Sequence, residues 1–224
     1  MIRGRIAEVF ESIQGEGIYL GEKQVFVRFY GCNLKCRYCD TNLDCYTEYT
    51  PRELLHEIKV YRHKFHSVSF TGGEPLLQKD FLKEAMRLTH HANLKNYLET
   101  NGTLPRALEE VLDHVHIIAM DLKLPSSTGH KDLWKAQQDF LKVASKKEVF
   151  LKAVICRSTK EEDLREAIKL IKRTSRSAFL VLQPNSLENG RGLLDKCESF
   201  KSICWQEKVS TCIIPQIHKK IGVR

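Results

Sequence analysis

The hydrophobic and polar positions of this chain follow two periods in turn. Short runs rich in β-branched and aromatic residues are separated by longer stretches in which apolar residues recur every three or four positions. The short runs predict six strands, at residues 24–30, 67–70, 94–99, 116–122, 148–155 and 178–183. Strands that alternate with helices need crossover connections, so we predict an α/β fold with a mainly parallel sheet.

The helical stretches carry start signals and apolar faces. Thr50 before Pro51, with Glu53 three residues after Thr50, predicts a capped helix start. Ser158 and Glu161 repeat this capping box. Two further sets recur at helical spacing and are expected to be buried against the sheet: Leu164, Ala167, Ile168 and Ile171, and then Leu133, Gln137, Phe140, Leu141 and Ala144.

The number of strand–helix units predicts the architecture of the domain. Six strand–helix units in 224 residues predict an incomplete, TIM-like barrel, formed by a single domain over residues 1–224. Loops rich in glycine and polar residues follow five of the strands: "GCNLKCRYCDT", "TGGEP", "TNGT", "KLPSST" and "QPNS". Because the carboxyl ends of parallel strands meet at one edge, we expect these loops to form one site.

Composition narrows the class of protein. The chain is 42% hydrophobic, yet no stretch approaches the roughly 20 apolar residues of a membrane helix, and its start lacks the apolar run of a secretory signal. A cytoplasmic protein is expected. The net charge of +8 is interleaved with acids and apolar positions, so we expect neither a nucleic-acid partner nor a membrane partner.

Cysteines are the strongest chemical signal in the sequence. In a reducing compartment, a tight group of cysteines indicates a metal site or catalysis rather than disulfides. Cys32, Cys36 and Cys39 have the spacing C-x3-C-x2-C, which can hold three corners of a [4Fe-4S] cluster and leave one iron open. The alternative is a structural zinc site with Cys45 as a fourth ligand. The other cysteines are expected to be small buried hydrophobic residues: Cys156, Cys197, Cys204 and Cys212.

A second motif follows the next strand of the predicted sheet. In "TGGEP", Gly72 and Gly73 allow the backbone to approach a ligand closely, and Glu74 offers a carboxylate to an ammonium group. Taken alone, the same glycines also fit an ordinary tight turn. The position of this loop, one unit after the cysteine loop, favours a shared binding site.

The cysteine motif, with Tyr38 before its last cysteine, resembles the radical S-adenosylmethionine (radical SAM) superfamily. That resemblance implies that SAM chelates the open iron and that an electron from a flavodoxin or ferredoxin cleaves it to a 5'-deoxyadenosyl radical. It also implies the following SAM-binding residues: Gly73, Glu74, Asn101, Asp121, Lys123, Ser126 and Gln183. A cap or turn role is the alternative for the last five.

Further motifs resemble one family within that superfamily, the 7-carboxy-7-deazaguanine synthases. They are "QGEG", "FVRFYGCNLKCRYCDT", "TGGEPLLQ", "ETNGT", "DLKLPSS", "LQP" and "PQIHK". The resemblance implies a homodimeric lyase that contracts the ring of 6-carboxy-5,6,7,8-tetrahydropterin with loss of ammonia, on the route to queuosine and other deazapurines. Another radical SAM activity, such as activation of a glycyl-radical enzyme, is the nearest alternative, and a zinc-stabilised nucleic-acid-binding protein is a more distant one.

The same resemblance assigns the remaining candidate site residues. The substrate would contact Ile13, Gln14, Gly15, Arg28 and Thr71, and the candidate catalytic residues are Glu16, Arg28 and Thr71. A guanidinium fork suits the pterin carboxylate, and a hydroxyl at Thr41 can serve as a hard ligand for Mg²⁺. The structural alternatives are an Arg28 that reaches solvent, a Thr41 that caps the next turn and a flexible "QGEG" loop.

Overall fold

The computed structural model describes residues 2–41, 44–61, 64–131, 133–175, 177–188, 190–217 and 222. Within these residues one nine-stranded sheet runs in the order β3-β1-β2-β4-β5-β6-β7-β8-β9. Its strands are β1 (Gly4–Ile13), β2 (Lys23–Phe29), β3 (Thr47–Tyr49), β4 (Ser67–Gly72), β5 (Asn96–Thr100), β6 (Ile117–Asp121), β7 (Glu148–Ile155), β8 (Phe179–Pro184) and β9 (Thr211–Ile213).

The sheet is parallel except at one edge. From β2 through β9 every neighbouring pair is parallel, whereas β1 is antiparallel to both β2 and β3. Among the described strands the order begins at β3 and ends at β9, so the sheet curves without closing. The prediction of an incomplete barrel with a mainly parallel sheet is confirmed.

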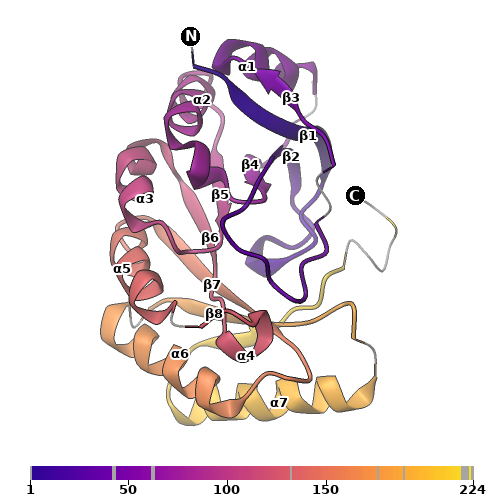
Figure 1. Cartoon of the computed structure of the whole chain (residues 1–224), viewed down its shortest axis with the longest axis vertical. Coiled ribbons are helices and arrows are strands. Elements are labelled where there is room, and N and C mark those ends of the chain that lie inside the picture. Colours follow the sequence, from indigo (N-terminus) through magenta and orange to yellow (C-terminus); the bar gives the residue numbers. More distant parts are fainter. Residues whose placement is uncertain are drawn as a thin grey trace.

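Helices cover the outer side of this curved sheet (Figure 1). They are α1 (Pro51–Val60), α2 (Lys79–His91), α3 (Pro105–Val111), α5 (Trp134–Ala144), α6 (Glu161–Thr174) and α7 (Arg191–Gln206), with a short α4 (Pro125–Thr128) after β6. Single 3-10 turns occupy Gly17–Tyr19, Pro75–Gln78 and Leu112–His114. No described helix has both the length and the apolar character that a membrane crossing requires.

Alternate residues of strand β7 face the hydrophobic core and the inner side of the sheet. In β7, Leu151 and Ala153 pack into the large core between sheet and helices, whereas Phe150 belongs to a smaller cluster on the inner face. Alternate residues of a strand face opposite sides, so Lys152, between Leu151 and Ala153, faces inward with Phe150. The inner face of the sheet is therefore free to carry polar side chains.

The two capping predictions have different outcomes. Thr50 and Glu53 bond each other's backbone N–H groups at the start of α1, as predicted. The second box is wrong, because α6 begins at Glu161 after Lys160, and the Ser158 hydroxyl instead donates to a backbone carbonyl in α4. Tertiary contact with the neighbouring loop outcompetes the local cap.

The predicted helical faces are largely buried as expected, but three strands of the structure were not predicted. The α6 face is buried as expected, and so is the α5 face except at Leu133, which precedes the helix and is partly exposed. Strands β1, β3 and β9 were not predicted from the sequence. In β1 the residues Glu8, Glu11 and Ser12 break the apolar run, so this strand lacks a strong β signal.

Candidate active site

A cavity of about 700 Å³ lies at the carboxyl ends of the parallel strands. Its lining includes every predicted site residue except Glu74 and Ser126. The predicted residues that line it are Ile13, Gln14, Gly15, Glu16, Arg28, Cys32, Cys36, Cys39, Thr41, Thr71, Gly73, Asn101, Asp121, Lys123 and Gln183. This volume falls in the range of small-molecule and cofactor sites.

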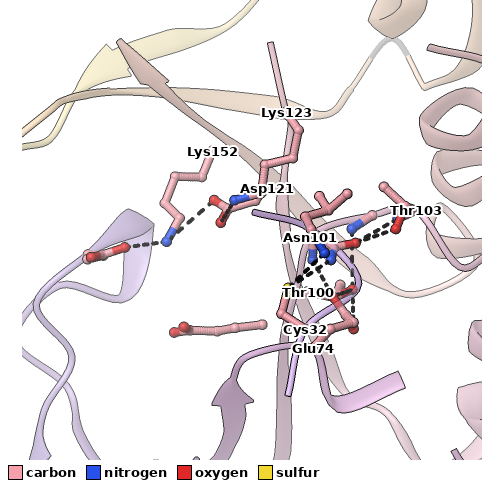
Figure 2. Close-up of polar contacts among 12 residues, drawn as sticks. Cys32, Glu74, Thr100, Asn101, Thr103, Asp121, Lys123 and Lys152 are labelled. Carbon is pink, nitrogen blue, oxygen red and sulfur yellow. Dashed lines mark hydrogen bonds and ion pairs between the residues drawn. The ribbon is translucent and has the colours of Figure 1, made fainter. Parts of the chain in front are cut away.

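The cysteine loop forms one wall of the cavity. A turn in which the Cys39 N–H donates to the Cys36 carbonyl (3.0 Å) keeps the last two cysteines close in space. Asn101 approaches the Cys32 sulfur through its side-chain amide, at 3.8 Å (Figure 2). Burial raises the pKa of the Cys36 thiol, and the positive charge of Lys123 opposes this shift in part. Among the described residues, no group of three or more histidine, cysteine or acidic side chains lies close enough together to hold a single metal ion.

The glycines of "TGGEP" pack the second loop against the cysteine loop. Gly73 donates to the Phe29 carbonyl at 3.0 Å, and Glu74 donates through its backbone to the Gly31 carbonyl at 2.8 Å. A β-carbon on Gly73 would lie 1.9 Å from the Gly31 oxygen, and Gly72 has φ +119, a conformation that favours glycine. Both glycines therefore serve a close approach of two backbones beside the cavity.

Glu74 faces the protein interior and does not line the cavity. Its carboxylate accepts hydrogen bonds from Thr100 Oγ1 and from the backbone N–H groups of Asn101 (2.7 Å) and Leu76 (3.1 Å), as Figure 2 shows in part. Burial raises the pKa of Glu74 to about 7, although these donors oppose the shift. In this arrangement Glu74 fixes the "ETNG" loop, and its contact with the SAM ammonium stays a prediction.

Two acceptors of the cavity have no hydrogen-bond partner among the described residues. They are Gln183 Oε1 and Asp121 Oδ1, both buried and on residues of the lining, and the Asp121 oxygen has an ion-pair contact of 3.6 Å with the Lys152 ammonium. Asp121 uses its other oxygen to accept from Lys123 at 2.9 Å, and the Lys123 ammonium lies 5.4 Å from the ring centre of Tyr38. Buried acceptors without partners are unfavourable, so a ligand with hydroxyl or amino donors would satisfy them. These acceptors and the three thiols fit SAM and an iron–sulfur cluster.

Ser126 lies apart from the cavity lining. Its backbone N–H and its hydroxyl both donate to Asp163 Oδ2, at 2.7 and 2.5 Å. This pair attaches the start of α4 to α6. Its assignment as a SAM residue stays a prediction, with its donors already satisfied by Asp163.

A hydrogen-bonded group forms the opposite wall of the cavity. Gln14 donates to Gln24 Oε1 at 3.0 Å and to Glu99 Oε1 at 2.8 Å, and its own oxygen accepts from the Glu16 backbone at 3.0 Å. Thr71 donates to Glu99 Oε2 at 2.7 Å. The "QGEG" loop is thus fixed by side-chain bonds, and Glu99 is a central site residue that the sequence reading missed. The sequence feature that could have indicated Glu99 is its position at a strand end, directly before "TNG".

Arg28 extends from β2 into the cavity lining. Its Nε lies 3.1 Å from Glu8 Oε2 on the paired strand β1, and its guanidinium carbon lies 5.6 Å from the ring centre of Phe10. These contacts hold the side chain at the cavity wall. Arg28 thus lies at the cavity wall, and its role in substrate binding stays a prediction.

Lys152 and Gln216 also belong to the site and were not identified from the sequence. The Lys152 ammonium forms an ion pair with Glu16 and lies 3.6 Å from Asp121 Oδ1 (Figure 2), while Gln216 donates to Glu16 at 2.5 Å. Burial lowers the pKa of Lys152, but the carboxylates around it outweigh this effect and hold the pKa well above its usual range. A lysine within the apolar run "EVFLKAVI" was the available signal.

Thr41 and Cys45 follow the cysteine loop, on either side of residues 42–43, which lie outside the described part of the chain. Thr41 is half-buried and lines the cavity together with Asp40. Cys45 is exposed and is absent from the lining, whereas Cys156, Cys197 and Cys204 are buried as expected and Cys212 is half-buried.

Comparisons with known proteins identify the family. Residues 26–189 match the model of the radical SAM superfamily. A 7-carboxy-7-deazaguanine synthase of Geobacter sulfurreducens is 35% identical, over 97% of this chain and 96% of that protein. The crystal structure of QueE from Escherichia coli has the same fold, with a TM-score of 0.65, 18% identity and 94% and 93% of the two chains covered.

A second solved structure matches in fold alone. Streptococcus suis SuiB bound to S-adenosylmethionine has a TM-score of 0.58 at 18% identity, and the match covers 82% of this chain and 44% of that one. The match to the superfamily model spans well over half of the chain, and the Geobacter relative matches almost end to end. The chain belongs to the 7-carboxy-7-deazaguanine synthase family of radical SAM enzymes, whose cofactors are SAM and an iron–sulfur cluster.

Proposed function

We propose that this chain, acting as a single domain over residues 1–224, converts 6-carboxy-5,6,7,8-tetrahydropterin to 7-carboxy-7-deazaguanine with release of ammonia. One observation carries the proposal: a single cavity joins the cysteine loop on one wall to Arg28, Gln14 and Glu16 on another. The first wall suits the cofactors and the second suits a small anionic heterocycle. Membership of the family supports the same reaction.

The cofactors fit one end of the cavity. A [4Fe-4S] cluster would be held by Cys32, Cys36 and Cys39, and with SAM it supplies the 5'-deoxyadenosyl radical that removes a hydrogen from the substrate. Gln183 Oε1 has no hydrogen-bond partner among the described residues and offers an acceptor to a donor group of SAM. Asp121 Oδ1, 3.6 Å from the Lys152 ammonium, can accept from a second donor group. These side chains would orient the cofactor.

The substrate fits the other end of the cavity. The guanidinium of Arg28 lies in the cavity lining, with its Nε 3.1 Å from Glu8 Oε2, and suits the pterin carboxylate as a two-pronged donor. Gln14, Glu16 and Thr71 offer hydrogen-bonding groups beside the ring. Fixed donors and acceptors of this kind favour one orientation of the substrate over others.

A magnesium ion and two protein partners complete the proposal. Thr41 and Asp40 both line the cavity and carry oxygen atoms of the kind that Mg²⁺ prefers, so we assign Thr41 as a ligand of that ion at the substrate. The ion would orient substrate oxygens and stabilise charge that develops during ring contraction. A reduced flavodoxin or ferredoxin would supply the electron, and the family resemblance supports a homodimer.

The decisive experiment is an anaerobic assay of the reconstituted protein. It would be incubated with carboxytetrahydropterin, SAM, Mg²⁺ and dithionite, and the products followed by chromatography and mass spectrometry. Formation of carboxydeazaguanine and ammonia is expected. A protein that instead cleaves SAM but leaves the pterin unchanged would contradict the proposal and favour another radical SAM activity.

A further inference from the structure

Lys152 lies where three carboxylates meet on the inner face of the sheet. It projects from the middle of β7, has 7% of its surface exposed, and is flanked in the chain by the buried Leu151 and Ala153. A lysine is rarely buried unless it is paired, because removing its charge from water is costly. Its retention in this position therefore needs an explanation in the site.

The three carboxylates come from three other parts of the fold. Glu16 follows β1, Glu99 is in β5 and Asp121 ends β6. Lys152 contacts Glu16 directly, lies 3.6 Å from Asp121, and has a favourable electrostatic interaction with Glu99. Glu16 and Lys152 are separated by 136 positions in the sequence, so this contact exists only in the folded protein.

The three carboxylates belong to two parts of the site. Glu16 is in the "QGEG" loop, and Glu99 accepts from both Gln14 and Thr71, all on the substrate side. Asp121 leads to Lys123 on the cofactor side. One ammonium group is thus shared between both halves of the cavity, as Figure 2 shows for Lys152, Asp121 and Lys123.

We propose that Lys152 is a positioning residue that sets the distance between substrate and SAM by holding Glu16 and Asp121 on opposite sides of one ammonium group. This inference rests on the proposed function. The pKa of Lys152 is held well above its usual range, so this ammonium is a poor proton donor near neutral pH. A role as a direct acid is therefore disfavoured. The reacting carbon and the radical source must lie in near contact, and small errors in such distances are costly.

The test compares Lys152→Met, which removes the charge at similar length, with Lys152→Arg, which keeps it. Lys142→Met, at an exposed lysine of α5, is the matched control. For Lys152→Met we expect kcat/KM to fall about 100-fold and the ratio of 5'-deoxyadenosine to carboxydeazaguanine to rise, because SAM is cleaved without productive transfer. Lys152→Arg keeps the charge, so its ratio of 5'-deoxyadenosine to carboxydeazaguanine should be close to that of the wild type. The Lys142→Met control should match the wild type. Values within about twofold of the wild type for Lys152→Met, in rate and ratio alike, would overturn the inference.

A binding measurement separates this inference from the proposed function. Calorimetry of SAM with the cluster-bearing proteins needs no substrate, and we expect about tenfold weaker binding to Lys152→Met than to the wild type or the Lys142→Met control. Equal SAM affinity would count against a role for Lys152 on the cofactor side. If the wild type makes no carboxydeazaguanine, the proposed function fails while this comparison can still be read.

A double variant covers the case in which Lys152→Met folds poorly. Glu16→Gln combined with Lys152→Met removes both charges of the Glu16–Lys152 pair, so Glu16 is not left as a buried carboxylate without its cation. If the two residues act together, the double variant should lose clearly less kcat/KM than the product of the losses in Glu16→Gln and Lys152→Met. Losses that multiply would show independent roles and overturn the inference.

Discussion

Arg28 and Glu8 face each other across the antiparallel pair β1–β2, with the guanidinium Nε 3.1 Å from the Glu8 carboxylate. Both side chains are only partly exposed, at 27% and 36%. The pair holds the arginine at the cavity wall. A carboxylate-bearing ligand would therefore meet an arginine whose conformation is already restricted.

This relationship predicts how substrate binding depends on both residues. Arg28→Lys keeps the charge but loses the two-pronged geometry, so KM for the carboxypterin should rise about 30- to 100-fold, equivalent to roughly 2–3 kcal/mol, with a smaller change in kcat. Glu8→Gln should raise KM about three- to tenfold, because Arg28 loses its orienting partner. Steady-state kinetics would measure both.

Two controls make this prediction specific. Glu48→Gln, at an exposed position of the edge strand β3, should leave KM unchanged. A pterin without the carboxylate should bind the wild type and Arg28→Lys equally weakly. A large KM difference between these two proteins for the decarboxylated ligand would show that Arg28 does not read the carboxylate.

A second prediction concerns the number of cysteines that hold the cluster. Cys32→Ser, Cys36→Ser and Cys39→Ser should each lose the brown colour and the visible absorption of the anaerobically reconstituted protein. Cys45→Ser should keep both, because Cys45 is exposed and does not line the cavity. Loss of bound metal in Cys45→Ser, measured by elemental analysis, would indicate four thiolate ligands and revive a zinc-type site.

A third prediction uses the close approach of the two site loops. Gly73→Ala places a β-carbon 1.9 Å from the Gly31 carbonyl oxygen, which forces the "TGGEP" and cysteine loops apart. We expect the free energy of unfolding to fall by about 3 kcal/mol, near the upper end for overpacked positions, and cluster loading to fall with it. Denaturant unfolding and iron content would measure the two effects.

Gly192→Ala is the matched control for that substitution. Gly192 lies in the first turn of α7, and a β-carbon there has no atom within 4 Å. Alanine favours the helix, so this variant should be as stable as the wild type or up to about 1 kcal/mol more stable. Equal stability of Gly73→Ala and Gly192→Ala would contradict the tight packing of the loops.

Much of this architecture follows from local sequence. The strand predicted at 148–155 coincides with β7, and the cap at Thr50 forms as expected, because both depend on neighbours within a few residues. Strand β1, which lies between β3 and β2, was missed because its polar residues weaken its β pattern. The parallel order follows from alternation of strands and helices, which constrains the connections.

The candidate site was predictable as a set of loops but not as a set of contacts. Gln14, Arg28 and the three cysteines meet at one cavity because the carboxyl ends of parallel strands share an edge. The direction of an individual side chain is a tertiary property: Glu74 follows the strand end yet points inward to Thr100. For the same reason the partners of Lys152 could not be derived from its neighbours in sequence.

The last prediction concerns a histidine cluster at the opposite end of the strands from the cavity. His90, at the end of α2, lies 5.0 Å from His116 and 6.1 Å from His114 between ring centres. Burial lowers the pKa of His114 and His116, and the charge of His90 lowers both further. His116 Nδ1 accepts a hydrogen bond from the Asn96 backbone at 3.0 Å, which requires that nitrogen to be unprotonated.

The sign of the pH effect follows from these lowered values. Between the folded-state pKa and the unfolded value of roughly 6.5, the unfolded chain binds more protons than the folded protein. The contribution of the neutral His114 and His116 to the free energy of unfolding is therefore complete above about pH 6.5. It is lost as the pH falls through the lowered folded-state pKa values. We expect the free energy of unfolding to decrease on acidification from about pH 7 to pH 5.

His90→Gln tests the origin of this dependence. It removes a charge that faces both rings, so the decrease in stability between about pH 7 and pH 5 should be shallower than in the wild type. His56→Gln is the control, because His56 lies on the separate helix α1. Urea unfolding at several pH values would give the slopes. Identical slopes for His90→Gln and the wild type would show that the three histidines titrate independently and that other groups set the acid sensitivity.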